Sequence, residues 1–142
     1  MDRLLMALPF VLSAACASGN GGGSPTTPSV RVDQEFTLAP GQTGAVNDAS
    51  LRVRFDEVTS DSRCPEGVQC VWEGDAAVAI SVSGGSGAAR RHELHTSPAD
   101  ERPAEAGEGD YVIRLVGLQP GTRASAPIPP GDYRATFVVR RR

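Results

Sequence analysis

Apolar and polar residues alternate along most of the chain from residue 30 onward. Leu51, Val53 and Phe55 fall on one face of an extended strand, and the arginines between them fall on the other face. Similar runs occupy residues 30–38, 76–82, 89–96, 111–116 and 133–139. Glycine and proline separate these runs, and no stretch keeps a helical period. The pattern predicts an all-β fold, an antiparallel β-sandwich of about seven strands and of immunoglobulin-like type, with a small open β-barrel as the alternative.

The run at 76–82 differs from the others because both of its faces are apolar or small. Val78, Ile80 and Val82 lie on one face, while Ala77 and Ala79 lie on the other. A strand that is apolar on both faces is typical of the interior of a sheet, so we expect this one to be central. Residues 83–87 (SGGSG) predict a hairpin turn, and the acidic, proline-containing residues 97–109 predict a loop.

Residues 1–15 have the pattern of a secretory signal peptide, with a charged start, a short apolar run and small residues at the end. The apolar run is about a dozen residues long, which is shorter than the roughly 20 residues that a membrane-spanning helix needs. The sequence Leu12-Ser13-Ala14-Ala15-Cys16 resembles the lipobox of bacterial lipoprotein signal peptides, with its leucine one position farther from the cysteine than usual. This resemblance implies cleavage before Cys16, lipidation of Cys16 and anchoring to a membrane. The alternative is cleavage after Ala17, which would leave a secreted or periplasmic soluble protein.

Residues 16–29 consist mainly of glycine, serine, threonine and proline, so we expect a flexible tether rather than a folded element. A flexible chain of about 13 residues spans roughly 20 Å on average, enough to hold a domain clear of a lipid surface. Residues 30–142 then form the β-sandwich domain. We expect an exported, membrane-anchored and monomeric protein of the cell envelope, whose envelope protein or glycan partner the sequence does not identify.

Composition limits the possible partners of this domain. The chain has 142 residues, 39% of them hydrophobic, which suits one small domain. Its formal net charge is -3. The absence of a basic excess argues against nucleic-acid binding.

Cys64 and Cys70 are the cysteines that remain once Cys16 is set aside, and in an exported chain we expect them to form a disulfide. A redox-active pair is the alternative, but the C-x-x-C spacing is missing. Residues 62–74 (SRCPEGVQCVWEG) resemble a C-P-x4-C-x-W-x-G loop in uncharacterised exported bacterial lipoproteins, where it precedes a strand rich in valine and alanine. The resemblance implies export and the strand that follows, and it implies no chemistry.

Trp72 follows the second cysteine of this loop at a distance of two residues. We expect its ring to pack on the disulfide and on the end of the sheet, with the indole N–H bonded to a loop carbonyl. Stacking on a ligand is the alternative. Together with Glu73 and Asp75, Trp72 therefore marks a possible surface site.

Metal sites and catalytic sites have weaker support in the sequence. Acidic residues crowd the cysteine segment and could bind calcium, although they lack EF-hand spacing: Asp56, Glu57, Asp61, Glu66, Glu73 and Asp75. His92 and His95 are three apart on a strand, so their side chains should point to opposite faces, which disfavours zinc. We therefore expect a non-enzymatic domain with a binding or structural role and no cofactor. A metal-dependent (calcium or zinc) or hydrolytic envelope enzyme is the alternative.

Overall fold

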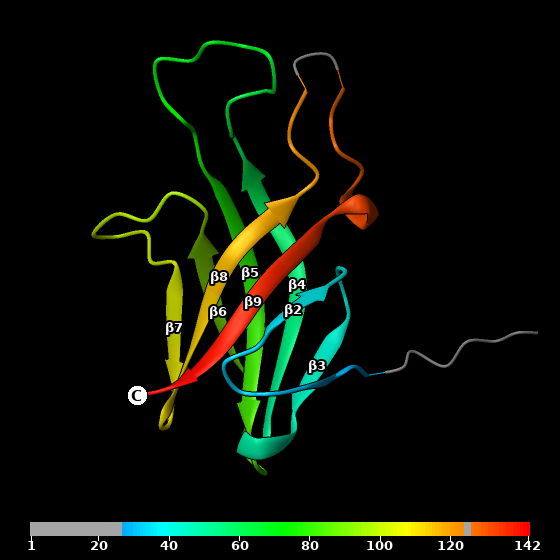
Figure 1. The fold of residues 1–142 in the computed structure, drawn as a ribbon, viewed down its shortest axis with the longest axis vertical. Coiled ribbons are helices and arrows are strands. Elements are labelled where there is room, and N and C mark those ends of the chain that lie inside the picture. Colours follow the sequence, from blue (N-terminus) through cyan, green and yellow to red (C-terminus); the bar gives the residue numbers. More distant parts are fainter. Residues whose placement is uncertain (1–26, 124–125) are drawn as a thin grey trace, which may run out of the picture.

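The computed structural model describes residues 27–123 and 126–142 and shows two stacked β-sheets (Figure 1). The expected signal peptide, the lipidation site Cys16 and nearly all of the tether lie outside the described residues. The five-stranded sheet has the order β1 (Ser29–Val30), β3 (Thr43–Val46), β4 (Leu51–Asp61), β5 (Ala76–Gly84) and β6 (Arg90–His95). The four-stranded sheet has the order β2 (Glu35–Leu38), β9 (Arg134–Arg141), β8 (Tyr111–Gln119) and β7 (Glu105–Glu108). The predicted β-sandwich is confirmed, and the alternative barrel is not formed.

All strand pairs are antiparallel except β1 and β3, which run parallel. The longest pairing joins β4 to β5, from Leu51 opposite Gly84 to Asp61 opposite Ala76. Two short 3-10 turns, η1 (Asn47–Ala49) and η2 (Pro130–Asp132), connect strands at the surface. Ser29 already pairs with Ala45, so the folded part begins one residue before the expected boundary at residue 30.

The core lies between the sheets and contains the residues that the alternation predicted. Leu51, Val53 and Phe55 of β4 are buried and so is the inner face of β5. The outer face of β5 is buried as well: Ala79 lies between Glu57 of β4 and Glu93 of β6, whose longer side chains flank it on the same face. The strand is interior as expected. Its outer face is covered by side chains of the neighbouring strands and not by another layer of structure.

The described residues form nine strands instead of about seven, because β3 and β7 carry weak patterns. In β3, a Cβ at Gly44 would lie 3.2 Å from Val30 and 3.3 Å from the ring of Phe36, so larger neighbours cover a small residue there. In β7, Ala106 is the one buried apolar residue. The prediction of a continuous loop at 97–109 was therefore wrong at its end, where β7 pairs with β8 through four residue pairs.

The sandwich has two distinct ends. At one end, residues 62–75 join β4 to β5 and lie beside residues 120–122, which follow β8 (Figure 1). We call residues 62–75 the cysteine loop and this end the loop end. The N-terminal strand β1 lies near the other end of β4, because Val30 pairs with Val46 and Val46 pairs with Leu51. From the first to the last of its eleven residues, β4 spans about 33 Å, at a rise of roughly 3.3 Å for each step between neighbouring residues.

Candidate functional site

The cysteine loop is closed at its base by a disulfide and by backbone hydrogen bonds. Cys64 and Cys70 form the expected disulfide, with their Cα atoms 5.9 Å apart. The N–H of Ser62 donates to the carbonyl of Asp75 over 2.7 Å, and the N–H of Cys64 donates to the carbonyl of Glu73 over 2.8 Å. These bonds continue the β4–β5 ladder into the loop, so its two arms stay together beyond the last strand residues.

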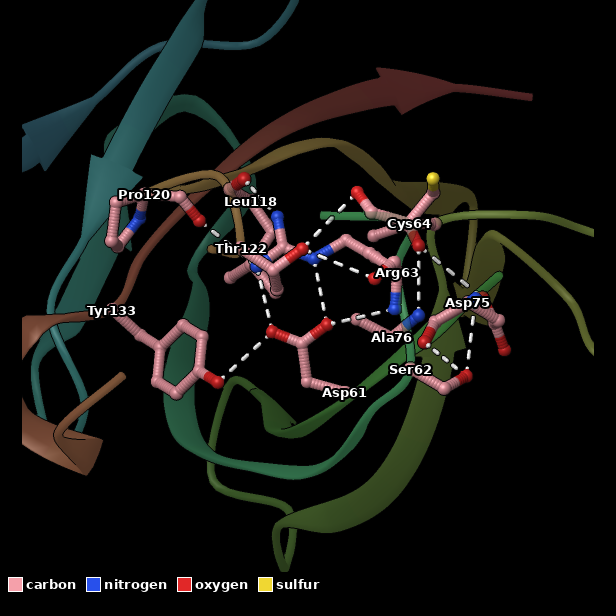
Figure 2. Close-up of polar contacts among 11 residues, drawn as sticks. Asp61, Ser62, Arg63, Cys64, Asp75, Ala76, Leu118, Pro120, Thr122 and Tyr133 are labelled. Carbon is pink, nitrogen blue, oxygen red and sulfur yellow. Dashed lines mark hydrogen bonds and ion pairs between the residues drawn. The ribbon is translucent and has the colours of Figure 1, made fainter. Parts of the chain in front are cut away.

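Arg63 attaches this loop to the opposite sheet (Figure 2). Its Nε donates to Oδ1 of Asp61 over 2.8 Å, and one Nη donates to Oδ2 of the same carboxylate over 2.7 Å. The guanidinium also donates to the carbonyls of Leu118, over 2.7 Å, and Pro120, over 2.9 Å. One side chain therefore links the end of β4 to the end of β8, which belongs to the four-stranded sheet.

Thr122 and Tyr133 complete this bracing. The hydroxyl of Thr122 contacts the carbonyls of Arg63 and Cys64 over 3.1 and 3.2 Å, and its own carbonyl accepts the N–H of Glu66 over 2.8 Å. The hydroxyl of Tyr133 donates to Oδ2 of Asp61 over 3.0 Å. A groove of about 490 Å³ runs beside this cluster, lined in part by Thr122 and Tyr133.

The electrostatics of the cluster keep its ion pair charged. Burial alone would raise the pKa of Asp61, but hydrogen bonds from Arg63 and Tyr133 outweigh it and hold that pKa below its ordinary value. The hydrogen bond to Asp61 raises the pKa of Arg63, while burial and the same carboxylate raise the pKa of Tyr133. At neutral pH the cluster is thus an ion pair with a neutral phenol, an arrangement suited to holding the loop.

Asp75 closes the other side of the loop end. Its Oδ2 accepts a hydrogen bond from Nδ1 of His95 over 2.6 Å, and its Oδ1 accepts the N–H of Ser97 over 2.9 Å. Burial would raise the pKa of Asp75, but the bonds from Ser97, His95 and Thr96 hold it below its ordinary value. Because an ionised carboxylate only accepts, Nδ1 of His95 carries a proton. Asp75 belongs to the predicted surface site, yet its side chain is only 13% exposed and these protein groups already engage it.

Gly74 allows the chain to turn from the loop into β5. Its φ is +72°, in the left-handed region that favours glycine. A Cβ at this position would collide with the backbone carbonyl of Ser62. A side chain here would therefore push apart the two arms of the loop.

Trp72 does not pack as the sequence predicted. Its side chain is 82% exposed, and no hydrogen bond joins its indole N–H to any residue that the structure describes. Val71 is 93% exposed and Val68 is 46% exposed. In the described residues, the other exposed large apolar side chain is Val116. The packing expectation was wrong because the arms of the loop project beyond both sheets, where Trp72 has no layer to pack against.

Trp72, Glu73 and Asp75, the residues of the predicted surface site, meet along one open groove of about 440 Å³. We call it the Trp72 groove; the remaining residues that line it are Ser62, Gly74, Ser97 and Arg102. Sequence reasoning missed Ser97 and Arg102, which lie in the segment expected to be a loop. Nothing local in the sequence links them to Trp72, because hydrogen bonds to Asp75 bring that segment to the groove.

The acidic residues and the histidines do not gather into a metal site within the described residues. Asp56 accepts from Ser81 over 2.7 Å and Glu57 pairs with Arg91 over 2.8 Å, away from the cluster around Asp61. Across residues 27–123 and 126–142, no group of three or more histidine, cysteine or acidic residues could hold a metal ion. His92 lies opposite the inward-facing Ile80 and His95 opposite Ala77 on the outer face, which confirms their predicted divergence.

No protein-family model, curated protein or solved structure matches this chain. In the part of the chain that the structure describes, no helix is both long enough and apolar enough to span a bilayer.

Proposed function

We propose that this protein is a non-enzymatic, lipid-anchored domain of the cell envelope that binds its partner with the cysteine loop. The observation that carries the proposal is the exposure of Val71 and Trp72, 93% and 82%, on a loop that the rest of the structure holds firmly. Grouped apolar side chains that remain in water are typical of interaction sites. Tryptophan is also among the residues that contribute most to binding energy at interfaces.

The bracing of the loop supports a binding role. The disulfide, the bonds of Arg63 to the opposite sheet and those of Thr122 all hold the base of the loop in one conformation. A surface that is ordered before it meets a partner loses less conformational entropy on binding than a flexible one. The firm base therefore favours a role for Val71 and Trp72 as a contact surface over a purely structural role for the loop.

The position of the loop also suits an anchored protein. The disulfide is typical of exported proteins, which supports a location outside the cytoplasm. β1, the first strand after the expected tether, lies at the end of the sandwich opposite the cysteine loop, about 33 Å away along β4. With a lipid on Cys16, the tether would join the domain at the end opposite the cysteine loop and would leave that loop accessible to partners in the envelope.

The anchor is tested by Cys16→Ser. Because acylation needs the thiol, we expect the wild-type protein in the membrane fraction and the variant in the soluble fraction. Intact-mass analysis of the mature wild-type protein should show an acylated N-terminal cysteine. An unmodified mature protein that starts at Ser18 would refute lipid anchoring.

The binding role is tested by photocrosslinking in cells. A photoreactive side chain placed at Val71 should form a discrete covalent adduct, because this position lies at the proposed contact surface. The matched control carries the same group at Ser86, which is exposed in the β5–β6 hairpin at the opposite end. Equal adducts from both positions, or none from Val71, would contradict binding through the loop.

The metal-dependent enzyme named as the alternative is tested by metal analysis of the purified protein. Stoichiometric calcium or zinc would support that alternative over the binding domain.

A further inference from the structure

The Trp72 groove combines one aromatic wall with polar walls. Its volume of about 440 Å³ lies within the range of roughly 300 to 1,000 Å³ that is usual for small-molecule sites. Trp72 provides an extended flat surface that is largely free of protein contacts. The polar residues Ser97 and Arg102 line the same groove, together with Glu73 and Asp75.

The aromatic wall favours a particular kind of ligand surface. The face of an indole ring carries partial negative charge, so it attracts C–H groups that carry partial positive charge. The apolar face of a pyranose ring presents several such C–H groups side by side. It is also flat and about as wide as the indole, so stacking buries apolar area on both partners.

The polar walls favour a ligand that carries many hydroxyl groups. The guanidinium of Arg102 is 49% exposed and lies 3.6 Å from Oδ2 of Asp75, which leaves several of its N–H groups directed to solvent. Glu73 is exposed and forms no ion pair with any described residue. Arg102 can only donate hydrogen bonds and the Glu73 carboxylate can only accept them, whereas a hydroxyl group does both.

A protein side chain fits the groove less well. An apolar side chain stacked on Trp72 would leave Arg102 and Glu73 without partners while removing water from them, which costs free energy. Val71, the most exposed large apolar residue in the described chain, does not line the groove. It can therefore report separately on contacts made outside the groove.

From these observations we infer that the Trp72 groove binds a saccharide, with one pyranose ring stacked on Trp72 and its hydroxyl groups bonded to Arg102 and Glu73. The inference rests on the proposed binding function and specifies the ligand class. The hydrogen bonds of Asp75 to His95 and Ser97 hold this lining residue in place before the ligand arrives. Arg102 needs little reorganisation, because Asp75 already lies beside it.

The test uses the fact that Trp72 is the single tryptophan of the chain, so its fluorescence reports directly on the groove. The full-length purified protein is titrated with three tetrasaccharides: cellotetraose, which is neutral, chitotetraose, which is N-acetylated, and tetragalacturonate, which is acidic. We expect a saturable change of emission with at least one of them. Failure of all three to give saturable binding overturns the inference.

Variants then locate the binding, measured by calorimetry because some of them lack the fluorophore. Trp72→Ala should weaken binding by about 10-fold or more, and Trp72→Phe, which keeps an aromatic face, should weaken it less. Arg102→Gln should weaken binding about 5-fold through loss of charged hydrogen bonds. The matched controls are Gln69→Ala, an exposed residue of the same loop that does not line the groove, and Arg52→Gln at the opposite end. Both should bind within about 2-fold of wild type.

Two outcomes separate this inference from the proposed function. If Gln69→Ala weakens saccharide binding as much as Trp72→Ala, the contact is not confined to the groove and the inference fails. If no tetrasaccharide binds but the photoreactive group at Val71 still forms its adduct, the loop docks on a protein; the inference then fails while the binding function stands. The side chains of Trp72 and Arg102 are both exposed, so we expect their variants to keep the circular dichroism spectrum of wild type. An unchanged spectrum excludes misfolding as the cause of weaker binding.

Discussion

Arg63 and Asp61 form a two-pronged pair at the point where β4 leaves the sheet. Two hydrogen bonds of 2.8 and 2.7 Å join the guanidinium to the two carboxylate oxygens. The side chain of Arg63 is only 16% exposed and that of Asp61 only 9%. The remaining N–H groups of Arg63 reach carbonyls at the end of β8, 55 residues or more along the chain. The pair therefore ties the cysteine loop to both sheets.

Arg63→Lys should lower the free energy of unfolding by about 2 to 3 kcal/mol. Lysine keeps the charge but lacks the planar guanidinium with its several N–H donors. The carbonyls of Leu118 and Pro120 and part of the Asp61 carboxylate therefore lose their donors. Urea denaturation measures the change. The matched control is Arg91→Lys, which alters the exposed pair with Glu57 and should leave the midpoint unchanged. Similar midpoints for both variants would argue against a bracing role for Arg63.

Gly74→Ala should destabilise the protein more than Gly85→Ala. Both glycines have positive φ, +72° and +54°, but only at Gly74 does an added Cβ collide with backbone. We expect a loss of about 1 kcal/mol for Gly85→Ala from conformational strain alone, and about 2 to 3 kcal/mol for Gly74→Ala. Thermal denaturation of the two variants compares these losses. Equal losses would show that the loop arms can move apart at little cost.

Replacement of both Cys64 and Cys70 by serine should lower the free energy of unfolding by about 2.4 kcal/mol. This value is the free-energy equivalent, at 25 °C, of the conformational entropy that closing a seven-residue loop removes from the unfolded chain. Far-UV circular dichroism should not change, because the strands form without the disulfide. In the native wild-type protein, neither Cys64 nor Cys70 should react with a thiol reagent. Two reactive thiols besides Cys16 would instead indicate a labile, redox-active pair.

Ile80→Ala should cost about 2 to 5 kcal/mol, because the side chain is fully buried between the sheets and its loss leaves a cavity. The matched control is Val116→Ala on β8, where the side chain is 46% exposed, and its effect should stay within about 0.5 kcal/mol. Melting midpoints of the two variants test the assignment of the inner face of β5. An unchanged midpoint for Ile80→Ala would contradict it.

Stability should fall in acid because of Asp61 and Asp75. The folded-state pKa of each lies below the ordinary value of 3.8, so folding favours the ionised forms. Their stabilisation is present in full above about pH 5 and is lost as the pH falls below 3.8 through the folded-state pKa values. Urea midpoints between pH 7 and pH 2 measure this loss. The Asp61→Asn and Asp75→Asn variants should be less stable at pH 7, and their stability should fall less steeply as the pH decreases. If stability falls with pH as steeply as in wild type, these two carboxylates are not the cause of the acid sensitivity.

Local patterns in the sequence were enough to predict the class of fold and much of its core. Strand alternation depends on side-chain direction, which reverses at each residue, so Leu51, Val53 and Phe55 could be placed on one buried face before any contact was known. The disulfide followed from the number of cysteines and the expected compartment. β3 and β7 were not predicted, because Gly44 and Gly107 leave their patterns weak.

Sequence patterns alone were sufficient to predict the sandwich, its buried faces, the disulfide and a possible site at Trp72, Glu73 and Asp75. They did not predict that Trp72 projects into water, because its exposure depends on where the two sheets end. Only the structure brought Arg102 to Asp75 and Arg63 to the end of β8. These contacts join residues 27 to 57 positions apart, and their positions depend on how the sheets pack, which no local pattern encodes.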